Sequence, residues 1–154
     1  RQGRESEQLF PYGIYTIPEV SMIGKTEAQL TAEGVSYEVG LADYQELAKG
    51  QMLGGADGFL KLIFHTETLK LLGVHCIGDG ATEIIHIGQV KVQLARTAAR
   101  KNASAFLVSA FLRCFGGTIE YFQTAVFNFP TLAEAYNVAA ADGLRKVDHE
   151  LGEY

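Results

Sequence analysis

Four histidines and two cysteines are the side chains of this sequence that most readily bind a metal ion or act as a base or nucleophile. They are His65, His75, His86, His149, Cys76 and Cys114. No two of the histidines have the i, i+4 spacing of a helical zinc site, and neighbouring positions of a strand point His75 and Cys76 to opposite faces. The sequence therefore predicts no metal site. His86, on an apolar helix, is interpreted as a packed or interface residue, and Cys114, in an apolar stretch, as buried.

A glycine-rich step, Gly78-Asp79-Gly80, connects a predicted strand to a predicted helix. A dinucleotide-binding loop would have its third glycine where this chain has Glu83, and a carboxylate at a helix N-terminus repels a pyrophosphate. The preceding strand also belongs to a predicted hairpin rather than to a βαβ unit. We therefore interpret this step as a tight turn into a helix that Glu83 helps to stabilise.

A Phe-Pro-Thr step lies near the end of the chain. Phe127 and Phe129 precede Pro130-Thr131, and Glu134 follows on the first turn of a predicted helix. Pro130 is predicted at the first helical position, where its missing N–H costs no hydrogen bond. This helix is expected to run to about Val147, with an inward side made of Leu132, Ala135, Tyr136, Ala139 and Leu144.

Residues 90–117 contain five basic residues and no acidic one: Lys91, Arg96, Arg100, Lys101 and Arg113. The run ASAFLVSAFL at 103–112 is too apolar for a solvent-facing loop and must pack on something. We favour a continuation of the preceding helix followed by a second, apolar helix. The alternative is a helical hairpin that binds an anionic surface or a partner.

The elements that position these residues are strands and helices that do not alternate regularly. Strands are predicted at 13–17, 20–24 and 36–43, and a helix at 27–33 begins after Thr26 and ends at Gly34. Residues 58–65 and 69–78 are predicted to form a hairpin around a short polar turn. Further helices are predicted at 81–99 and 118–127. This order predicts an α+β fold, with a mainly antiparallel sheet flanked by helices.

Length and composition narrow the class of protein. The chain has 154 residues, of which 47% are hydrophobic and 20% charged, enough for one domain with its own core. Its net charge of -5 argues against nucleic-acid binding. No signal peptide opens the chain, and no apolar run reaches the roughly 18 residues of a membrane span. Two unpaired cysteines are typical of a reduced, cytoplasmic protein. Because the chain begins with Arg1, we interpret it as a processed product or a piece of a longer protein.

Four stretches together resemble the C-terminal dimerisation domain of the pyridine nucleotide-disulfide oxidoreductase family. They are GIYTIPEVSMIGKTEAQL, SYEVGLADYQELAKGQ, GFLKLIFHTETLKLLGVHCIGDGATEIIHIGQ and TIEYFQTAVFNFPTLAEAYNVAA. The likeness covers roughly residues 12–90 and 117–147. It implies a dimerisation domain at 12–148, with an atypical basic and apolar helical insertion at about 91–116. Residues 1–11 would be a linker or tail, and residues 149–154 a tail.

The resemblance also suggests what the Phe-Pro-Thr step does. In the disulfide reductases of this family a histidine precedes Pro-Thr and serves the redox thiols of the partner subunit, while a glutamate orients it. The histidine position here is Phe129, which has no titratable proton, and the glutamate position is Glu134. The resemblance therefore implies a transhydrogenase, which moves hydride between NADPH and NAD through FAD. Phe129, Pro130 and Thr131 would line the partner subunit's FAD, Glu134 would be a structural remnant, and no catalytic residue is expected. The alternative for Phe129 is core packing.

The resemblance further implies a homodimer, with His86 and the last helix near its two-fold axis. The family's FAD and NAD domains are not visible in this sequence, so the chain alone is expected to be inactive and to bind neither FAD nor NAD(P). Two alternatives remain open. The chain is a stand-alone dimerising module that does no chemistry, or it is a fragment of a disulfide reductase whose acid/base role has moved elsewhere.

Overall fold

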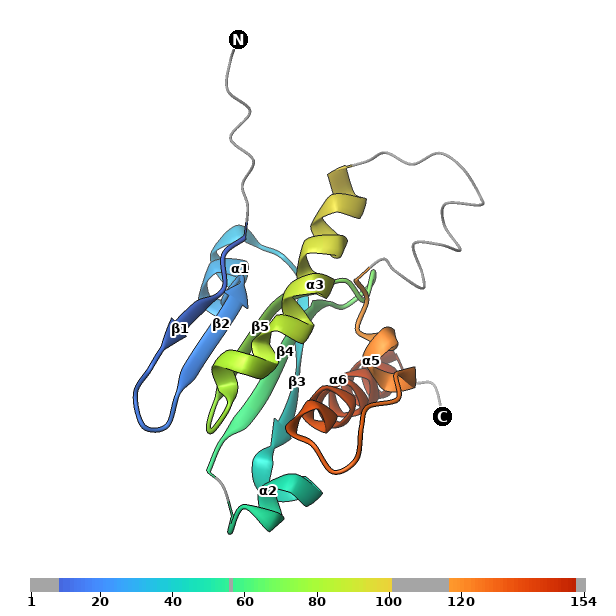
Figure 1. Cartoon of the computed structure of the whole chain (residues 1–154). Coiled ribbons are helices and arrows are strands. Elements are labelled where there is room, and N and C mark those ends of the chain that lie inside the picture. Colours follow the sequence, from blue (N-terminus) through green and yellow to red (C-terminus); the bar gives the residue numbers. More distant parts are fainter. Residues whose placement is uncertain (1–8, 56, 101–116, 152–154) are drawn as a thin grey trace.

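The computed structural model describes residues 9–55, 57–100 and 117–151, which form a sheet with helices on it (Figure 1). The strands are β1 (Tyr12–Ile14), β2 (Val20–Gly24), β3 (Tyr37–Asp43), β4 (Phe59–His65) and β5 (Leu71–Ile77). The α-helices are α1 (Glu27–Glu33), α2 (Ala48–Met52), α3 (Ala81–Arg100), α5 (Glu120–Thr124) and α6 (Ala135–Leu151). Two short 3-10 turns, η1 (Tyr44–Glu46) and η2 (Leu132–Glu134), precede α2 and α6.

The five strands form one sheet in the order β1-β2-β5-β4-β3, and every neighbouring pair is antiparallel. This arrangement confirms the predicted α+β fold with an antiparallel sheet. The predicted hairpin is β4–β5, in which Leu62 pairs with Val74. The ring Nδ1 of His65 accepts the backbone N–H of Glu67 at 3.1 Å and so closes the turn. His65 therefore has a structural partner within its own hairpin.

The core lies between one face of the sheet and the helices α3 and α6 (Figure 1). Helix α3 packs against β2 and β5, and α6 packs against β3 and β4. The closest approach is at Gly40 of β3, where an added Cβ would lie 2.0 Å from the carbonyl oxygen of Ala139. A glycine here lets α6 sit directly on the strand. The fully buried core side chains include Leu60, Leu62, Phe64, Val74, Ile85, Phe122 and Tyr136.

Helix α1 has the limits that the sequence predicts. Thr26 and Gln29 form a capping box at its start, and Gly34 ends it with a left-handed φ of 68°. The carboxylate of Glu27 pairs with Lys61 of β4 at 2.6 Å. Lys61 alternates with the core residues of β4, so this pair places α1 on the sheet face opposite α3 and α6.

Two predicted elements are shorter in the structure. The first strand ends at Ile14, and the helix predicted at 118–127 spans only Glu120–Thr124. The side-chain amide of Asn137 donates to the carbonyl oxygens of Phe122 at 2.6 Å and Gln123 at 3.2 Å. Because a residue of α6 satisfies these carbonyls, the short helix ends early and the chain continues in an extended form from Ala125.

The start of the last helix also differs from the prediction. Pro130 is not the first helical residue, because Thr131 has the extended backbone of an N-cap (φ -142°, ψ 161°) and η2 begins after it. Helix α6 then continues to Leu151, past the predicted end near Val147, so residues 149–151 are helical rather than a tail. Its predicted inward residues Ala135, Tyr136, Ala139 and Leu144 are buried, and Leu132 is half-buried.

The glycine-rich step is a tight turn, as predicted, with positive φ at Gly78 and Gly80. The carboxylate of Glu19 accepts the N–H and the hydroxyl of Thr82, at 3.1 and 2.7 Å, and so caps α3. These hydrogen bonds lower the pKa of Glu19. The predicted insertion at 91–116 falls partly on α3, which continues to Arg100 with Val92 and Ala95 buried. Residues 101–116, with the predicted second helix and Cys114, lie outside the described residues.

Candidate functional site

The segment between α5 and η2 packs on an aromatic cluster of the core. The ring of Tyr136 lies 4.7 Å from the ring of Phe122 and 6.4 Å from the ring of Phe127, centroid to centroid. Tyr136 and Phe122 are fully buried, and Phe127 packs against the core. We call residues 125–131 the loop. Its inner side is therefore part of the hydrophobic core although its backbone is irregular.

The C-terminal end of the loop is held by polar contacts of Thr131. Its hydroxyl donates to the carbonyl oxygen of Asn128 at 2.7 Å, and its N–H donates to the carboxylate of Glu134 at 3.4 Å. Glu134 is therefore engaged in capping the turn on which it sits. Pro130, Thr131 and Glu134 are each half-buried, and the structure brings all three of these predicted site residues together with Phe129.

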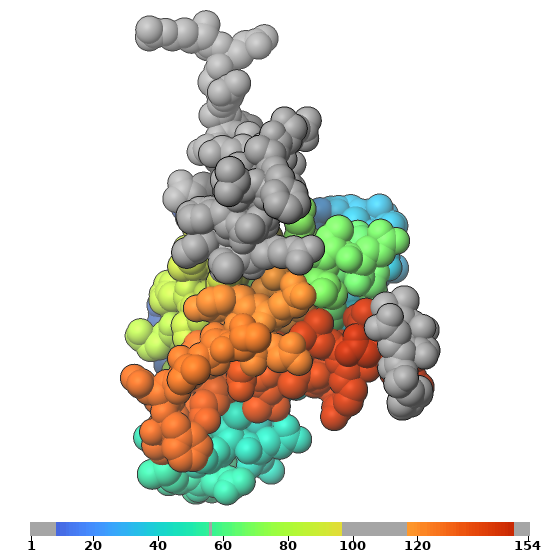
Figure 2. Space-filling model, turned by 90° about the vertical axis from the view of Figure 1, so that its right-hand side faces the viewer, coloured from blue at the N-terminus to red at the C-terminus, as the bar shows by residue number. Residues whose placement is uncertain are grey.

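The outer side of the loop presents apolar side chains to solvent. Phe129 is 73% exposed and Val126 is 98% exposed. Core packing as the role of Phe129 is therefore wrong for this chain. Figure 2 shows α5 and the loop on the surface beside α6. Single exposed apolar side chains are common on protein surfaces, so this exposure alone does not identify a binding site.

Helix α3 adds a second exposed apolar position. Val90 is 57% exposed, and His86 lies one turn before it, also exposed, with Nδ1 2.8 Å from the Oε1 of Gln89. The prediction that His86 is packed in the core is wrong, and its place at an interface stays a prediction. A third exposed apolar group lies on β1 and on the residues that flank it, namely Phe10, Tyr12, Ile14, Tyr15 and Ile17.

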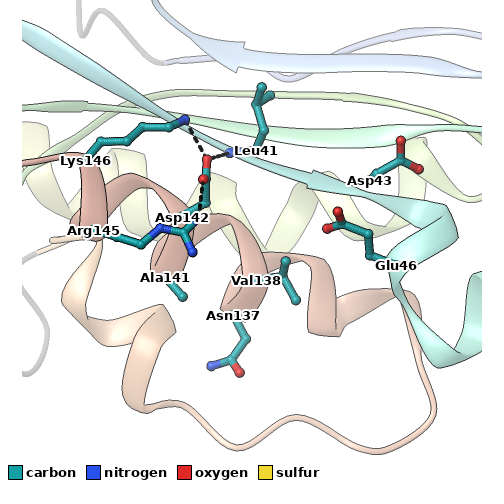
Figure 3. Close-up of a pocket in the computed structure, with 9 residues that line it drawn as sticks. All are labelled: Leu41, Asp43, Glu46, Asn137, Val138, Ala141, Asp142, Arg145 and Lys146. Carbon is teal, nitrogen blue, oxygen red and sulfur yellow. Dashed lines mark hydrogen bonds and ion pairs between the residues drawn. The ribbon is translucent and has the colours of Figure 1, made fainter.

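A pocket between β3 and α6 is lined mostly by charged side chains (Figure 3). Asp142 accepts the backbone N–H of Leu41 at 3.0 Å, and Lys146 donates to Asp142 at 2.6 Å and to the carbonyl oxygen of Val39 at 2.8 Å. Strand β3 is at the edge of the sheet. These two side chains therefore occupy backbone groups that an edge strand would otherwise offer to another strand. Sequence periodicity gave no sign of this contact.

The remaining titratable groups do not gather into a metal site in the part of the chain that the structure describes. No group of three possible ligands comes together among those residues. Cys76 is buried, with its sulfur 3.1 Å from the hydroxyl of Tyr44, and burial raises the pKa of this thiol to about 11. His75 points to the other face of β5, as predicted, and burial lowers its pKa. Among the described helices, none has the length and apolarity needed to cross a bilayer.

Comparison with known proteins shows which family shares this architecture. The family model described as pyridine nucleotide-disulphide oxidoreductase, dimerisation domain, matches residues 10–109. The soluble pyridine nucleotide transhydrogenase of Marinomonas sp. is 48% identical over 94% of this chain, and that of Klebsiella pneumoniae is 49% identical over 95%. The match covers 27% and 28% of those two relatives. The chain thus spans about a quarter of the length of the curated relatives.

Solved structures share the fold at low sequence identity. LpdA from Mycobacterium tuberculosis has a TM-score of 0.66 at 18% identity, covering 86% of this chain and 24% of LpdA. The HOCl-induced flavoprotein disulfide reductase RclA from Escherichia coli has a TM-score of 0.66 at 19% identity, covering 87% of this chain and 26% of RclA. The family model covers most of the chain, and the sheet and helices shared with these solved structures agree with it. The chain therefore belongs to the dimerisation domains of the pyridine nucleotide-disulphide oxidoreductase family.

Proposed function

We propose that this chain is the dimerisation domain of a cytoplasmic, FAD-dependent NAD(P) transhydrogenase, which moves hydride between NADPH and NAD. The remaining part of the full-length protein would hold FAD and NAD(P). Two copies of the domain would associate, and Phe129, Pro130 and Thr131 of one copy would line the flavin site of the partner subunit. The chain by itself would be inactive.

The observation that carries this proposal is the state of Phe129. Phe129 is 73% exposed, whereas Phe127 of the same loop packs on the core and Thr131 makes two hydrogen bonds. Phenylalanine holds no proton at any pH, so this position cannot exchange protons with a thiol. An apolar wall fits hydride transfer, which gains from the exclusion of water and needs no acid or base at this place. The names of the relatives, soluble pyridine nucleotide transhydrogenase, support the same activity.

The hydrogen bond of Glu134 also supports the proposal. In a working acid/base pair its carboxylate would have to face the proton carrier. Here the carboxylate accepts the N–H of Thr131 at 3.4 Å. That contact stabilises the first turn after the loop, a role that needs no neighbouring histidine. The alternative of a disulfide reductase fragment therefore has no acid/base group at this position, and nothing else on the loop can replace it.

The activity is tested by recovering the reading frame that precedes Arg1 and expressing the whole protein. We expect hydride transfer from NADPH to thio-NAD, a bound flavin and no reduction of lipoamide or glutathione disulfide. Phe129→His should not create disulfide reduction, because a histidine without redox thiols has nothing to serve. Reduction of either disulfide by the unaltered protein would overturn the proposal in favour of the disulfide reductase alternative. An open reading frame without nucleotide-binding loops would favour the stand-alone module.

The dimer is tested by sedimentation equilibrium of the full-length protein, because the flavin site that Phe129 would line lies outside this chain. Each dimer would bury two copies of Phe129, which is 73% exposed here, and each copy contributes about 1–2 kcal/mol. Phe129→Ser should therefore weaken the dimer by about 2–4 kcal/mol, or about 30-fold to 1000-fold. Phe10→Ser is the matched control, because Phe10 is 62% exposed but belongs to the separate group on β1. It should change the dissociation constant less than twofold. A full-length protein that stays strictly monomeric at high concentration, or equal effects of the two variants, would contradict the proposed interface.

A further inference from the structure

The hydroxyl of Tyr136 joins α6 to the backbone of α3. It donates to the carbonyl oxygen of Ile84 at 2.8 Å and accepts the N–H of Gly88 at 3.0 Å. Ile84 and Gly88 are four residues apart, so these are the two groups that a regular α-helix would bond to each other. The hydroxyl of a residue 48 positions later in the chain thus lies within the hydrogen-bond ladder of α3.

Gly88 makes room for this contact. A Cβ added at Gly88 would lie 2.9 Å from the Tyr136 hydroxyl and 2.7 Å from Cγ2 of Val74 on β5. Both distances are shorter than a carbon atom tolerates, so a side chain here would push α3 away from the sheet and from Tyr136 together. The glycine has an ordinary helical backbone, since its φ is not among the positive values of the chain. Close approach alone explains the lack of a side chain.

Tyr136 also contacts the loop directly. Its ring lies 6.4 Å from the ring of Phe127, and the residue is the second of α6, immediately after η2. Burial raises its pKa far above the physiological range, so the hydroxyl keeps its proton and can donate and accept at once. One side chain therefore contacts the loop with its ring and α3 with its hydroxyl.

We propose that Tyr136 is a positioning residue, which sets the loop that carries Phe129 against α3 so that the two form one rigid interface. This inference rests on the proposed dimer. Tyr136, a core residue, would keep Phe129 aligned with the exposed face of α3 that carries His86 and Val90. The loop and its flanking turns are joined to α3 by the Tyr136 hydroxyl and by the contacts of α3 with η2. Lys91 of α3 adds a third contact, since its Nζ lies 3.3 Å from the ring centre of Tyr121 in α5. Removing the hydroxyl should loosen the loop while the ring stays in the core.

The first test measures motion of the loop in Tyr136→Phe at concentrations where the chain is monomeric. NMR relaxation dispersion of the backbone amides of residues 126–131, proline excluded, should show exchange on the microsecond to millisecond scale that the unaltered chain lacks. Tyr44→Phe is the matched control, because Tyr44 is also fully buried and its hydroxyl contacts Cys76 at 3.1 Å, away from the loop. Gly88→Ala, which crowds the hydroxyl from the side of α3, should produce the same motion as Tyr136→Phe.

The second test asks whether Tyr136 acts through Phe129. In the full-length protein, Tyr136→Phe should weaken the dimer about fivefold to tenfold when Phe129 is present and less than twofold in the Phe129→Ser background. The second effect is smaller because Phe129→Ser already removes the side chain that Tyr136 positions. Equal effects in both backgrounds, or loop motion in Tyr44→Phe as large as in Tyr136→Phe, would overturn the inference. If the full-length protein proves monomeric, the proposed function fails, while the loop measurement still decides the role of Tyr136 in ordering the loop.

Discussion

Replacing Asp142 by alanine should release α6 from the edge of the sheet. Asp142 accepts the backbone N–H of Leu41 at 3.0 Å, and Lys146 and Arg145 pair with it at 2.6 and 3.0 Å. The side chain of Asp142 is 20% exposed, so these contacts are largely sheltered from water. The same helix carries Tyr136 in its first turn, and the docking of the helix on β3 therefore also supports the loop.

The cost of Asp142→Ala can be worked out from these contacts. A hydrogen bond between a charged group and a backbone N–H contributes about 1.5–3 kcal/mol. The pair with Arg145, whose side chain is 78% exposed, contributes about 0–1 kcal/mol at most. We therefore expect Asp142→Ala to lower the free energy of unfolding by about 2–4 kcal/mol. Asp142→Asn keeps an acceptor for Leu41 but loses the charge, and about half of that cost is expected.

The pH dependence has a definite sign. Partial burial alone would raise the pKa of Asp142, but the hydrogen bonds from Lys146 and Leu41 and the charge of Lys146 outweigh it, and the net pKa is lowered. A carboxylate with a lowered pKa in the folded state stabilises the fold above its unfolded pKa of about 3.9. That contribution is lost as the pH falls through the lower, folded value. The difference in stability between the unaltered chain and Asp142→Asn should therefore shrink as the pH is lowered from 7 towards 3.

Urea denaturation followed by circular dichroism at pH 7, 5, 4 and 3 measures these differences. Asp148→Ala is the control, because Asp148 lies exposed on the same helix, and a change within about 0.5 kcal/mol is expected. A cost below about 0.5 kcal/mol for Asp142→Ala at pH 7 would refute the importance of this contact. A gap between the unaltered chain and Asp142→Asn that is as large at pH 3 as at pH 7 would refute the electrostatic reasoning.

Two further predictions concern the core. Gly40→Ala places a Cβ 2.0 Å from the carbonyl oxygen of Ala139, which must force α6 off β3, and we expect a loss of about 3 kcal/mol or more in urea denaturation. Gly34→Ala, where the added Cβ meets nothing within 4 Å but the φ of 68° is strained, should cost only about 1 kcal/mol, and a larger loss there than at Gly40 would contradict the packing argument. In a Cys114→Ser background, Cys76 should react with a thiol reagent only after urea unfolds the chain, because burial raises its pKa to about 11, and rapid reaction in native buffer at pH 8 would show that the core is open.

Local sequence was sufficient for the elements whose signals lie within a few residues. Helix α1 begins after Thr26 and ends at Gly34 because both its cap and its left-handed stop are local. The β4–β5 hairpin follows from two alternating runs around a short polar turn. The family motifs likewise identified the domain and singled out Phe129. Each of these features depends on residues that remain neighbours whatever the rest of the chain does.

Local sequence failed where the partner of a residue lies far along the chain. The helix predicted at 118–127 ends early because the side chain of Asn137 donates hydrogen bonds to the carbonyl oxygens of its last turn. Helix α3 is capped by Glu19, which lies 63 residues before its partner Thr82. The exposure of His86 could not be read from an apolar pattern either, since the pattern does not say which face of the helix the sheet covers.

The sequence by itself determined the fold class and the family, because short-range periodicity and family motifs carry that information, and the resemblance predicts that Phe129 stands at the position of a proton carrier. Only the tertiary structure decided how the loop with Phe129 is held. The hydroxyl of Tyr136 reaches α3 across 52 residues, and Asp142 reaches β3 across 101 residues. Such contacts form only after the sheet has brought distant segments together, and hydrogen bonds between them depend on a few tenths of an ångström that no local pattern encodes.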